Sequence, residues 1–96
     1  MIEKKIFGEE HPSTATSYGN LGSVCDSIGE YNQAKELHEK ALMLTKKIFG
    51  EDHAFVATRY GNLGCVYYKI GEKSQANLLH EKAMMIRKKI SAKNNL

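Results

Sequence analysis

The sequence predicts an all-α fold of two stacked antiparallel helical hairpins, with partial repeats at both ends. Apolar residues recur at steps of three and four along most of the chain, which is the period of a helix with one buried face. Glycines follow these apolar stripes at places where helices would end. The chain also repeats itself after 42 residues, and no segment shows the alternation of a half-buried strand.

The repeat appears when residues 4–45 are aligned with residues 46–87. The alignment has no gap, and 26 of the 42 positions are identical. A third copy begins at Lys88 and departs at Ser91. We therefore expect one helical-repeat module over residues 1–96, a fragment of an α-solenoid. Its expected parts are the end of a preceding repeat helix with its loop (1–11), a first repeat (12–53), and a second repeat with a basic tail (54–96).

The first helix is expected over residues 12–28 and the third, its equivalent, over 54–70. Pro12 suits a first turn, where no amide donor is needed, and Gly29 follows the last apolar residue, where a helix end favours glycine. The side chains expected to be buried are Ala15, Tyr18, Leu21, Gly22, Cys25 and Ile28, then Ala57, Tyr60, Leu63, Gly64, Tyr67 and Ile70.

The second helix is expected over residues 31–48 and the fourth over 73–92. Gly50 ends the second helix, and the acidic residues after it precede the next helix, where the helix dipole favours negative charge. The expected buried stripes are Tyr31, Ala34, Leu37, His38, Ala41, Leu42, Leu44 and Ile48, then Ala76, Leu79, His80, Ala83, Met84, Ile86 and Ile90. Residues 2–7 match the last turns of such a helix.

Two pairs of glycines lie inside the first and third helices. Each interior glycine costs ~1 kcal/mol relative to alanine. Gly22 and Gly64 therefore predict a close approach of the facing helix. Gly19 and Gly61, three residues earlier, are expected on the exposed face, where they would widen a groove.

Composition indicates a globular chain and argues against several environments. No apolar run approaches the ~20 residues of a membrane span, and the N-terminal residues lack the apolar core of a secretory signal. Cys25 and Cys65 form no disulfide framework, which favours a reducing, cytoplasmic location. The net charge of +3 derives from the C-terminal helix and tail, whose basic residues are too few for a nucleic-acid footprint.

These residues together resemble the tetratricopeptide repeat. The match lies in Leu21, Gly22, Gly29, Tyr31, Ala34, Ala41 and Leu42, and again in Leu63, Gly64, Tyr67, Gly71, Ala76 and Ala83. The usual unit is ~34 residues, and the 42-residue unit of this chain is similar to the long-repeat branch of kinesin light chain and nephrocystin. The chain departs from the family pattern at Cys25, Ala54, Lys73, His38 and His80.

The resemblance implies a concave groove for an extended peptide, lined by the first helix of each hairpin. The groove positions carried onto this chain are Thr16, Asn20, Ser23, Ser27, Thr58, Asn62, Cys65, Tyr68 and Lys69, with Gly19, Asp26 and Gly61 beside them. An asparagine amide both donates and accepts, so Asn20 and Asn62 either hold a peptide backbone or hold the neighbouring hairpin. Thr16 and Thr58 replace the lysine of the chaperone-tail clamp, which argues against a C-terminal carboxylate ligand.

No pattern supports an enzyme, a metal site or a cofactor. The four histidines lack HxxxH or HExxH spacing, and their recurrence with the repeat indicates a role in stacking the hairpins. The Gly-Asn-Leu-Gly segments lie within helical stripes rather than after a strand, which argues against a nucleotide site. The serines and cysteines lack the spacing of an organised base and oxyanion donors.

We therefore expect a non-enzymatic protein–protein interaction scaffold that presents a peptide groove as part of a longer array. The alternative is a structural segment of an array, for example the sensor part of a nucleotide-switch protein, with no groove ligand. Because stable arrays usually need ~3 or more repeats, self-association is also expected, by end-to-end stacking or helix exchange. Neither a membrane nor a nucleic acid is expected as a partner.

Overall fold

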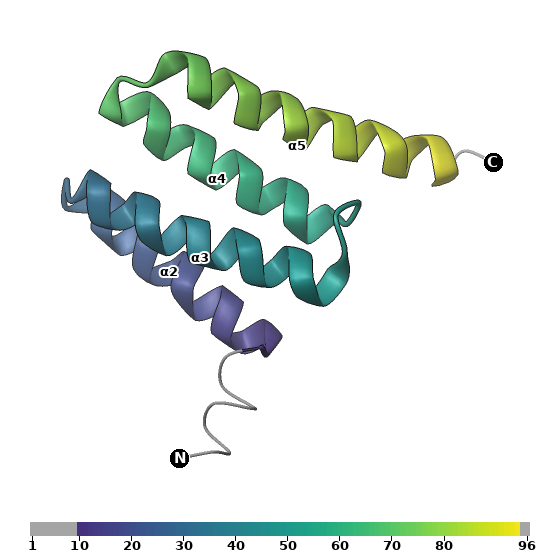
Figure 1. The fold of residues 1–96 in the computed structure, drawn as a ribbon, viewed down its shortest axis with the longest axis horizontal. Helices are drawn as coiled ribbons and strands as arrows, with labels where there is room; N and C mark the ends of the chain where they lie inside the picture. The colour runs from purple at the N-terminus through teal and green to yellow at the C-terminus, as the bar shows by residue number, and fades with distance from the viewer. Residues whose placement is uncertain (1–9, 95–96) are drawn as a thin grey trace.

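The computed structural model describes residues 10–94 and contains four α-helices in that range. They are α2 (Pro12–Ser27), α3 (Tyr31–Phe49), α4 (Ala54–Ile70) and α5 (Lys73–Asn94). Consecutive helices run in opposite directions and pack in chain order, so that α2 and α3 form a first hairpin and α4 and α5 a second (Figure 1). The predicted fold class is confirmed, and each helix end lies within two residues of its expected position. The helix expected over residues 2–7 lies outside the described residues.

Side chains and glycines both mark the helix ends. The His11 and His53 rings cap α2 and α4, because each Nδ1 accepts a hydrogen bond of 3.0 Å from the backbone N–H two residues later. Histidines 11 and 53 thus cap helices rather than stack hairpins, contrary to expectation. Gly71 ends α4 in the left-handed conformation, with φ of 102°, and Gly50 follows α3 with φ of 90°.

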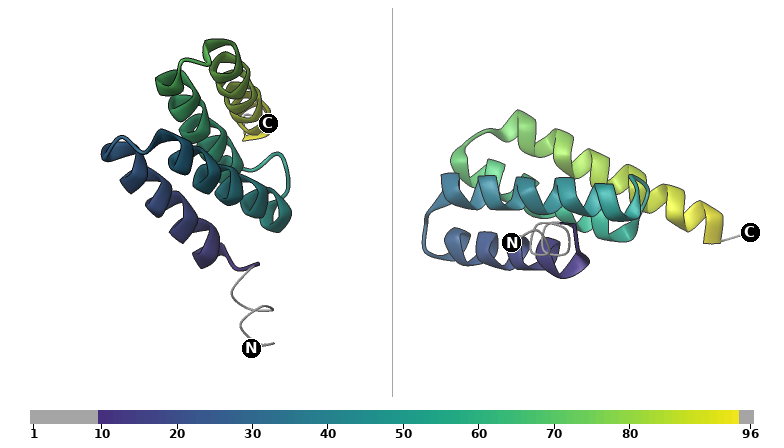
Figure 2. Two further views of the ribbon diagram at one scale, coloured as in Figure 1. Left: turned by 60° about the vertical axis from the view of Figure 1, so that its left-hand side comes forward. Right: turned by 60° about the horizontal axis from the view of Figure 1, so that its bottom comes forward.

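The hydrophobic core lies around α4, which packs against α3 on one side and α5 on the other (Figure 2). Its buried members are Leu42 from α3, Val56, Ala57, Tyr60 and Leu63 from α4, and Leu79, Ala83 and Ile86 from α5. The partly buried Tyr67 and Ile90 pack against this cluster. The core therefore joins the two hairpins into one body rather than filling each hairpin separately.

Gly22 and Gly64 each lie directly against a histidine ring of the facing helix, which confirms the predicted close approach of the two helices. A Cβ atom on Gly22 would lie 2.9 Å from Cδ2 and Nε2 of His38, and a Cβ atom on Gly64 would lie 2.9 Å from Nε2 of His80. Each contact joins the first helix of a hairpin to its second helix. Histidines 38 and 80 therefore pack within their own hairpins, at the positions where the resemblance implies an aromatic side chain.

Four residues expected in buried stripes are exposed instead. They are Leu21 and Ile28 on α2 and His80 and Met84 on α5; Leu21, Ile28 and Met84 are more than half exposed, and His80 is exposed although its ring contacts Gly64. Leu21 is 54% exposed, whereas its equivalent Leu63 is 3% exposed because α3 packs over it. The repeated sequence produces the same stripe twice, but a stripe is buried only where a neighbouring hairpin covers it.

The expectation for Gly19 is wrong. Gly19 is buried, and a Cβ atom there would lie 2.5 Å from Nη1 of Arg59, which reaches across from α4. Its equivalent Gly61 has no such neighbour within 4 Å. Gly19 thus makes room for a side chain of the next hairpin and does not widen a groove.

Candidate functional site

The nine residues expected to line a groove lie on two helices of the structure. Thr16, Asn20, Ser23 and Ser27 follow one face of α2, and all four are exposed. Thr58, Asn62, Cys65, Tyr68 and Lys69 lie on α4, where Asn62 is half-buried and the others are exposed. We call these nine residues the first-helix face. Its α2 and α4 parts meet where Lys69 pairs with Asp26 of α2.

Lys69 is held by its neighbour and is not available as an unpaired cation. Its Nζ atom donates to both carboxylate oxygens of Asp26, at 2.8 and 3.0 Å. The hydrogen bond to Asp26 raises the pKa of the Lys69 ammonium, so the ammonium stays charged at neutral pH. Lys69 also lines a cavity of about 350 Å³ beside the turn of the first hairpin, next to Gly29 and Tyr31.

Several polar side chains of the first-helix face have no hydrogen-bonding partner among residues 10–94, and the two asparagines are the amides among them. The amide side chains of Asn20 and Asn62 form no hydrogen bond with any residue between 10 and 94, although many other polar side chains there are paired. The alternative that they hold the neighbouring hairpin therefore has no support within this range. Each amide offers two donors and one acceptor at equivalent positions of the two hairpins.

Three further members of the face differ in what they offer. The Thr58 hydroxyl donates to the Ala54 carbonyl oxygen at 3.3 Å, within its own helix. Cys65 is an exposed free thiol. Tyr68 is 59% exposed, and Nζ of Lys73 lies 5.7 Å from the centre of its ring. Tyr68 thus adds an aromatic surface on which a ligand side chain can pack.

Arg59 is the residue that sequence reasoning missed. It extends from α4 over Gly19, and its Nε atom donates to the Thr45 hydroxyl of α3 at 3.3 Å. Burial lowers the pKa of the guanidinium, which nonetheless stays charged. Two features of the sequence could have indicated Arg59: the repeated glycine at positions 19 and 61, and the change from Ser17 in the first repeat to Arg59 in the second.

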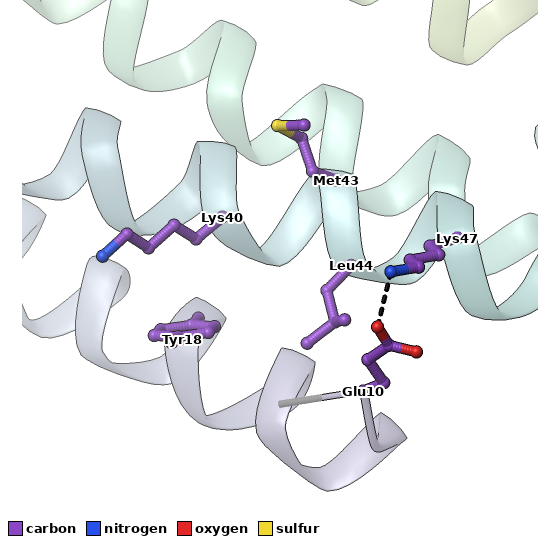
Figure 3. A pocket seen from close by; sticks show the side chains of 6 residues that line it. All are labelled: Glu10, Tyr18, Lys40, Met43, Leu44 and Lys47. Carbon is purple, nitrogen blue, oxygen red and sulfur yellow. Dashed lines mark hydrogen bonds and ion pairs between the residues drawn. The ribbon is translucent and has the colours of Figure 1, made fainter. Parts of the chain in front are cut away.

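A different surface contains a cavity that recurs with the repeat. In the first hairpin it has a volume of about 290 Å³, with Tyr18 and Leu44 toward its interior, Lys40 near the Tyr18 ring, and Lys47 paired with Glu10 (Figure 3). In the second hairpin five of the six equivalent residues line a cavity of about 190 Å³, where Lys89 pairs with Asp52 at 3.5 Å. In both hairpins the ion pair ties the second helix to the loop that precedes the first.

The described residues also bear on other kinds of site. Between residues 10 and 94, no group of three or more histidine, cysteine, aspartate or glutamate side chains is arranged to hold a metal ion. None of the four helices described is both long and apolar enough to cross a membrane.

Comparisons with known proteins agree with this architecture. A family model described as tetratricopeptide repeat matches residues 2–47 and 27–89. The crystal structure of BtubC (BKLC) from P. vanneervenii is similar, with a TM-score of 0.82 and 32% sequence identity over 84% of this chain. The match covers 32% of that protein, so this chain spans about a third of its length. No curated protein matches the chain at a significant level. From the two matched repeats and the shared helical stack, the chain belongs to the tetratricopeptide repeat family, and its 42-residue units are similar to those of the kinesin light chain-like type.

Proposed function

We propose that this protein is a non-enzymatic interaction scaffold whose first-helix face binds an extended peptide. Membership of the tetratricopeptide repeat family supports the general role, because such repeats mediate protein interactions. The observation that carries the peptide proposal is the pair of unpartnered amides on Asn20 and Asn62. Placed at equivalent positions on successive hairpins, they can each donate to and accept from a peptide backbone whatever its side chains are.

The charges of the face define the class of peptide. Lys69 is neutralised by Asp26, and Arg59 is engaged with Thr45 at the joint between the hairpins. Thr16 and Thr58 add hydroxyl groups without charge. A ligand would therefore bind through its backbone and through an apolar or aromatic side chain on Tyr68, rather than through a terminal carboxylate.

A peptide array probed with the wild-type chain and with single variants tests this proposal. Asn20→Ala and Asn62→Ala are each expected to weaken binding at least ten-fold for the same peptides. Asn77→Ala provides a matched control, because Asn77 is exposed on α5 and outside the first-helix face, and it should leave binding unchanged. Retained binding by both groove variants, with circular dichroism identical to wild type, would refute the role of the amides.

Self-association is the second candidate function, and a specific observation favours it. Leu21, Val24 and Ile28 form an exposed apolar row on α2, and the equivalent residues of α4 are buried or half-buried beneath α3. On α5, Met84 is exposed, whereas its equivalent Leu42 on α3 is buried in the core cluster with α4 residues. End-to-end stacking of copies, or exchange of a helix between them, would cover both faces.

Light scattering coupled to size-exclusion chromatography, at several concentrations, measures this association directly. A mass that rises with concentration supports it, and a constant monomer mass at high concentration rejects it. We also propose a cytoplasmic location, because Cys25 and Cys65 are both free thiols and a reducing compartment preserves them.

A further inference from the structure

Several polar contacts between described residues cross the joint between the first and second hairpins, which is formed mainly by α3 and α4, and three of them are side-chain hydrogen bonds donated by α4 residues. Besides Arg59, two further α4 residues contribute: the Tyr67 hydroxyl donates to the Glu39 carboxylate at 3.1 Å, and Lys69 pairs with Asp26. The three pairs are Arg59 with Thr45, Tyr67 with Glu39, and Lys69 with Asp26. In addition, Nζ of Lys35 lies 5.6 Å from the centre of the Tyr67 ring.

These contacts are made by residues that the two repeats do not share. The repeats differ at 16 of their 42 aligned positions, and five of the six residues in the three pairs are among them. Only Glu39 has an identical equivalent, Glu81. The other five exchanges are Arg59 for Ser17, Tyr67 for Cys25, Lys69 for Ser27, Thr45 for Arg87 and Asp26 for Tyr68.

The apolar residues of the same joint, in contrast, are identical in the two repeats. Leu63 and Val66 are buried and Ile70 is half-buried, and Leu63 packs in one cluster with Leu42 of α3; their equivalents on α2 are the identical residues Leu21, Val24 and Ile28. The contact of Lys46 with the Tyr60 ring, at 5.7 Å, is likewise available again through the equivalent pair of Lys88 and Tyr18. Apolar matching alone therefore does not distinguish the internal joint from a joint between two copies.

The polar positions do make that distinction. If a second copy stacks on the outer face of α5, its α2 occupies the place that α4 occupies within one chain. Arg87 of α5 then faces Ser17 on α2 of that copy. One arginine–hydroxyl contact can still form, but the arginine now comes from the second helix of a hairpin and the hydroxyl from the first. Glu81 faces a cysteine and Tyr68 faces a serine, so the other two charged contacts are lost.

We propose that Arg59, Tyr67 and Lys69, with Thr45 and Asp26, determine the order of the hairpins. They make the internal joint stronger than any joint between copies of this chain, and so keep stacking of copies weak. This inference rests on the self-association considered above as a proposed function. Two of the three contacts are lost between copies, and because both lie partly in solvent we expect the Kd between copies to be about ten-fold higher.

Exchanging the polar residues between the two faces tests the inference. A first variant carries Ser17→Arg, Cys25→Tyr and Ser27→Lys on α2, and a second carries Tyr68→Asp and Arg87→Thr on the outer faces of α4 and α5. Mixed together, they restore all three pairs at one joint. Sedimentation velocity should then show a 1:1 complex with a Kd at least ten-fold below that of wild-type self-association.

The separate variants serve as controls. The first variant alone places an arginine opposite Arg87, so its self-association should not exceed that of wild type. Adding Val24→Glu to the first variant should abolish the mixed complex, because it charges the shared apolar row. Circular dichroism establishes that each variant keeps its helical content.

The outcomes separate this inference from the proposed self-association. If wild-type chains stay monomeric but the mixed variants form the complex, self-association of the native chain is rejected and the role of the polar residues is supported. If the mixture binds no more tightly than wild type while both variants stay helical, the polar residues do not determine the order and the inference is overturned.

Discussion

Replacing Gly22 with alanine would place a methyl group against a ring that has little room to move. The new Cβ atom would lie 2.9 Å from two ring atoms of His38, which is closer than van der Waals contact allows. His38 is only 3% exposed. Either the ring or the whole of α3 must therefore shift.

Gly64→Ala is a matched comparison at the equivalent position. Its Cβ atom would approach Nε2 of His80 just as closely, at 2.9 Å. The His80 side chain, however, is exposed on the outer side of the second hairpin and can rotate away. The two substitutions therefore share their chemistry and their local contact, and differ in whether the contacted ring is enclosed.

The expected magnitudes follow from two opposing effects. Glycine to alanine inside a helix stabilises by ~1 kcal/mol, and insertion of a methyl group into an enclosed, well-packed site costs ~1–3 kcal/mol. Gly22→Ala should thus lower the free energy of unfolding by up to ~2 kcal/mol. Gly64→Ala should leave it unchanged or raise it by up to ~1 kcal/mol.

Urea denaturation followed by circular dichroism measures both variants under identical conditions. We expect the free energy of unfolding of Gly22→Ala to lie at least ~1 kcal/mol below that of Gly64→Ala, with unchanged m-values. In a chain that already carries His38→Ala, Gly22→Ala should cost less stability than it does in the wild-type chain, because the ring that the new methyl group would contact is absent. Equal effects of the two glycine substitutions would show that ring enclosure is not what requires glycine at this position.

Three further substitutions test other parts of the structure. Gly61→Ala, which places its Cβ in open space, should stabilise by ~1 kcal/mol, whereas Gly19→Ala should gain less because it displaces Arg59; thermal unfolding of the two variants compares them. His53→Ala should cost ~1 kcal/mol by removing the cap of α4, and His53→Asn should restore most of it in the same urea titration. Burial, opposed by Asp26 and assisted by Arg59, lowers the pKa of His38 from 6.5, so the folded state favours the neutral ring. Its contribution should be complete above about pH 6.5 and lost as the pH falls below that value, because the unfolded chain then takes up the proton first. His38→Leu should flatten this part of the pH profile, and an unchanged profile in that variant would contradict the prediction.

The candidate site was predictable in position but not in charge. Helical spacing places Thr16, Asn20, Ser23 and Ser27 on one face of α2, and this needs only a period of 3.6 residues. The pairing of Lys69 with Asp26 joins residues 43 positions apart, so it depends on how two hairpins meet. The same holds for Arg59: the difference from Ser17 marks the residue, but its position over Gly19 depends on how the two hairpins pack.

The sequence by itself determined the four helices, their ends and the close approach at Gly22 and Gly64. Those features are local: helical period, the conformational freedom of glycine and repetition act within one hairpin. Only the tertiary structure decided which copy of each repeated residue is enclosed. Leu63 and His38 are buried while Leu21 and His80 are exposed, although each pair is identical in sequence position and chemistry. In a repeat fold, a residue is buried only where a neighbouring hairpin packs over it. Two identical residues in equivalent positions can therefore differ in burial.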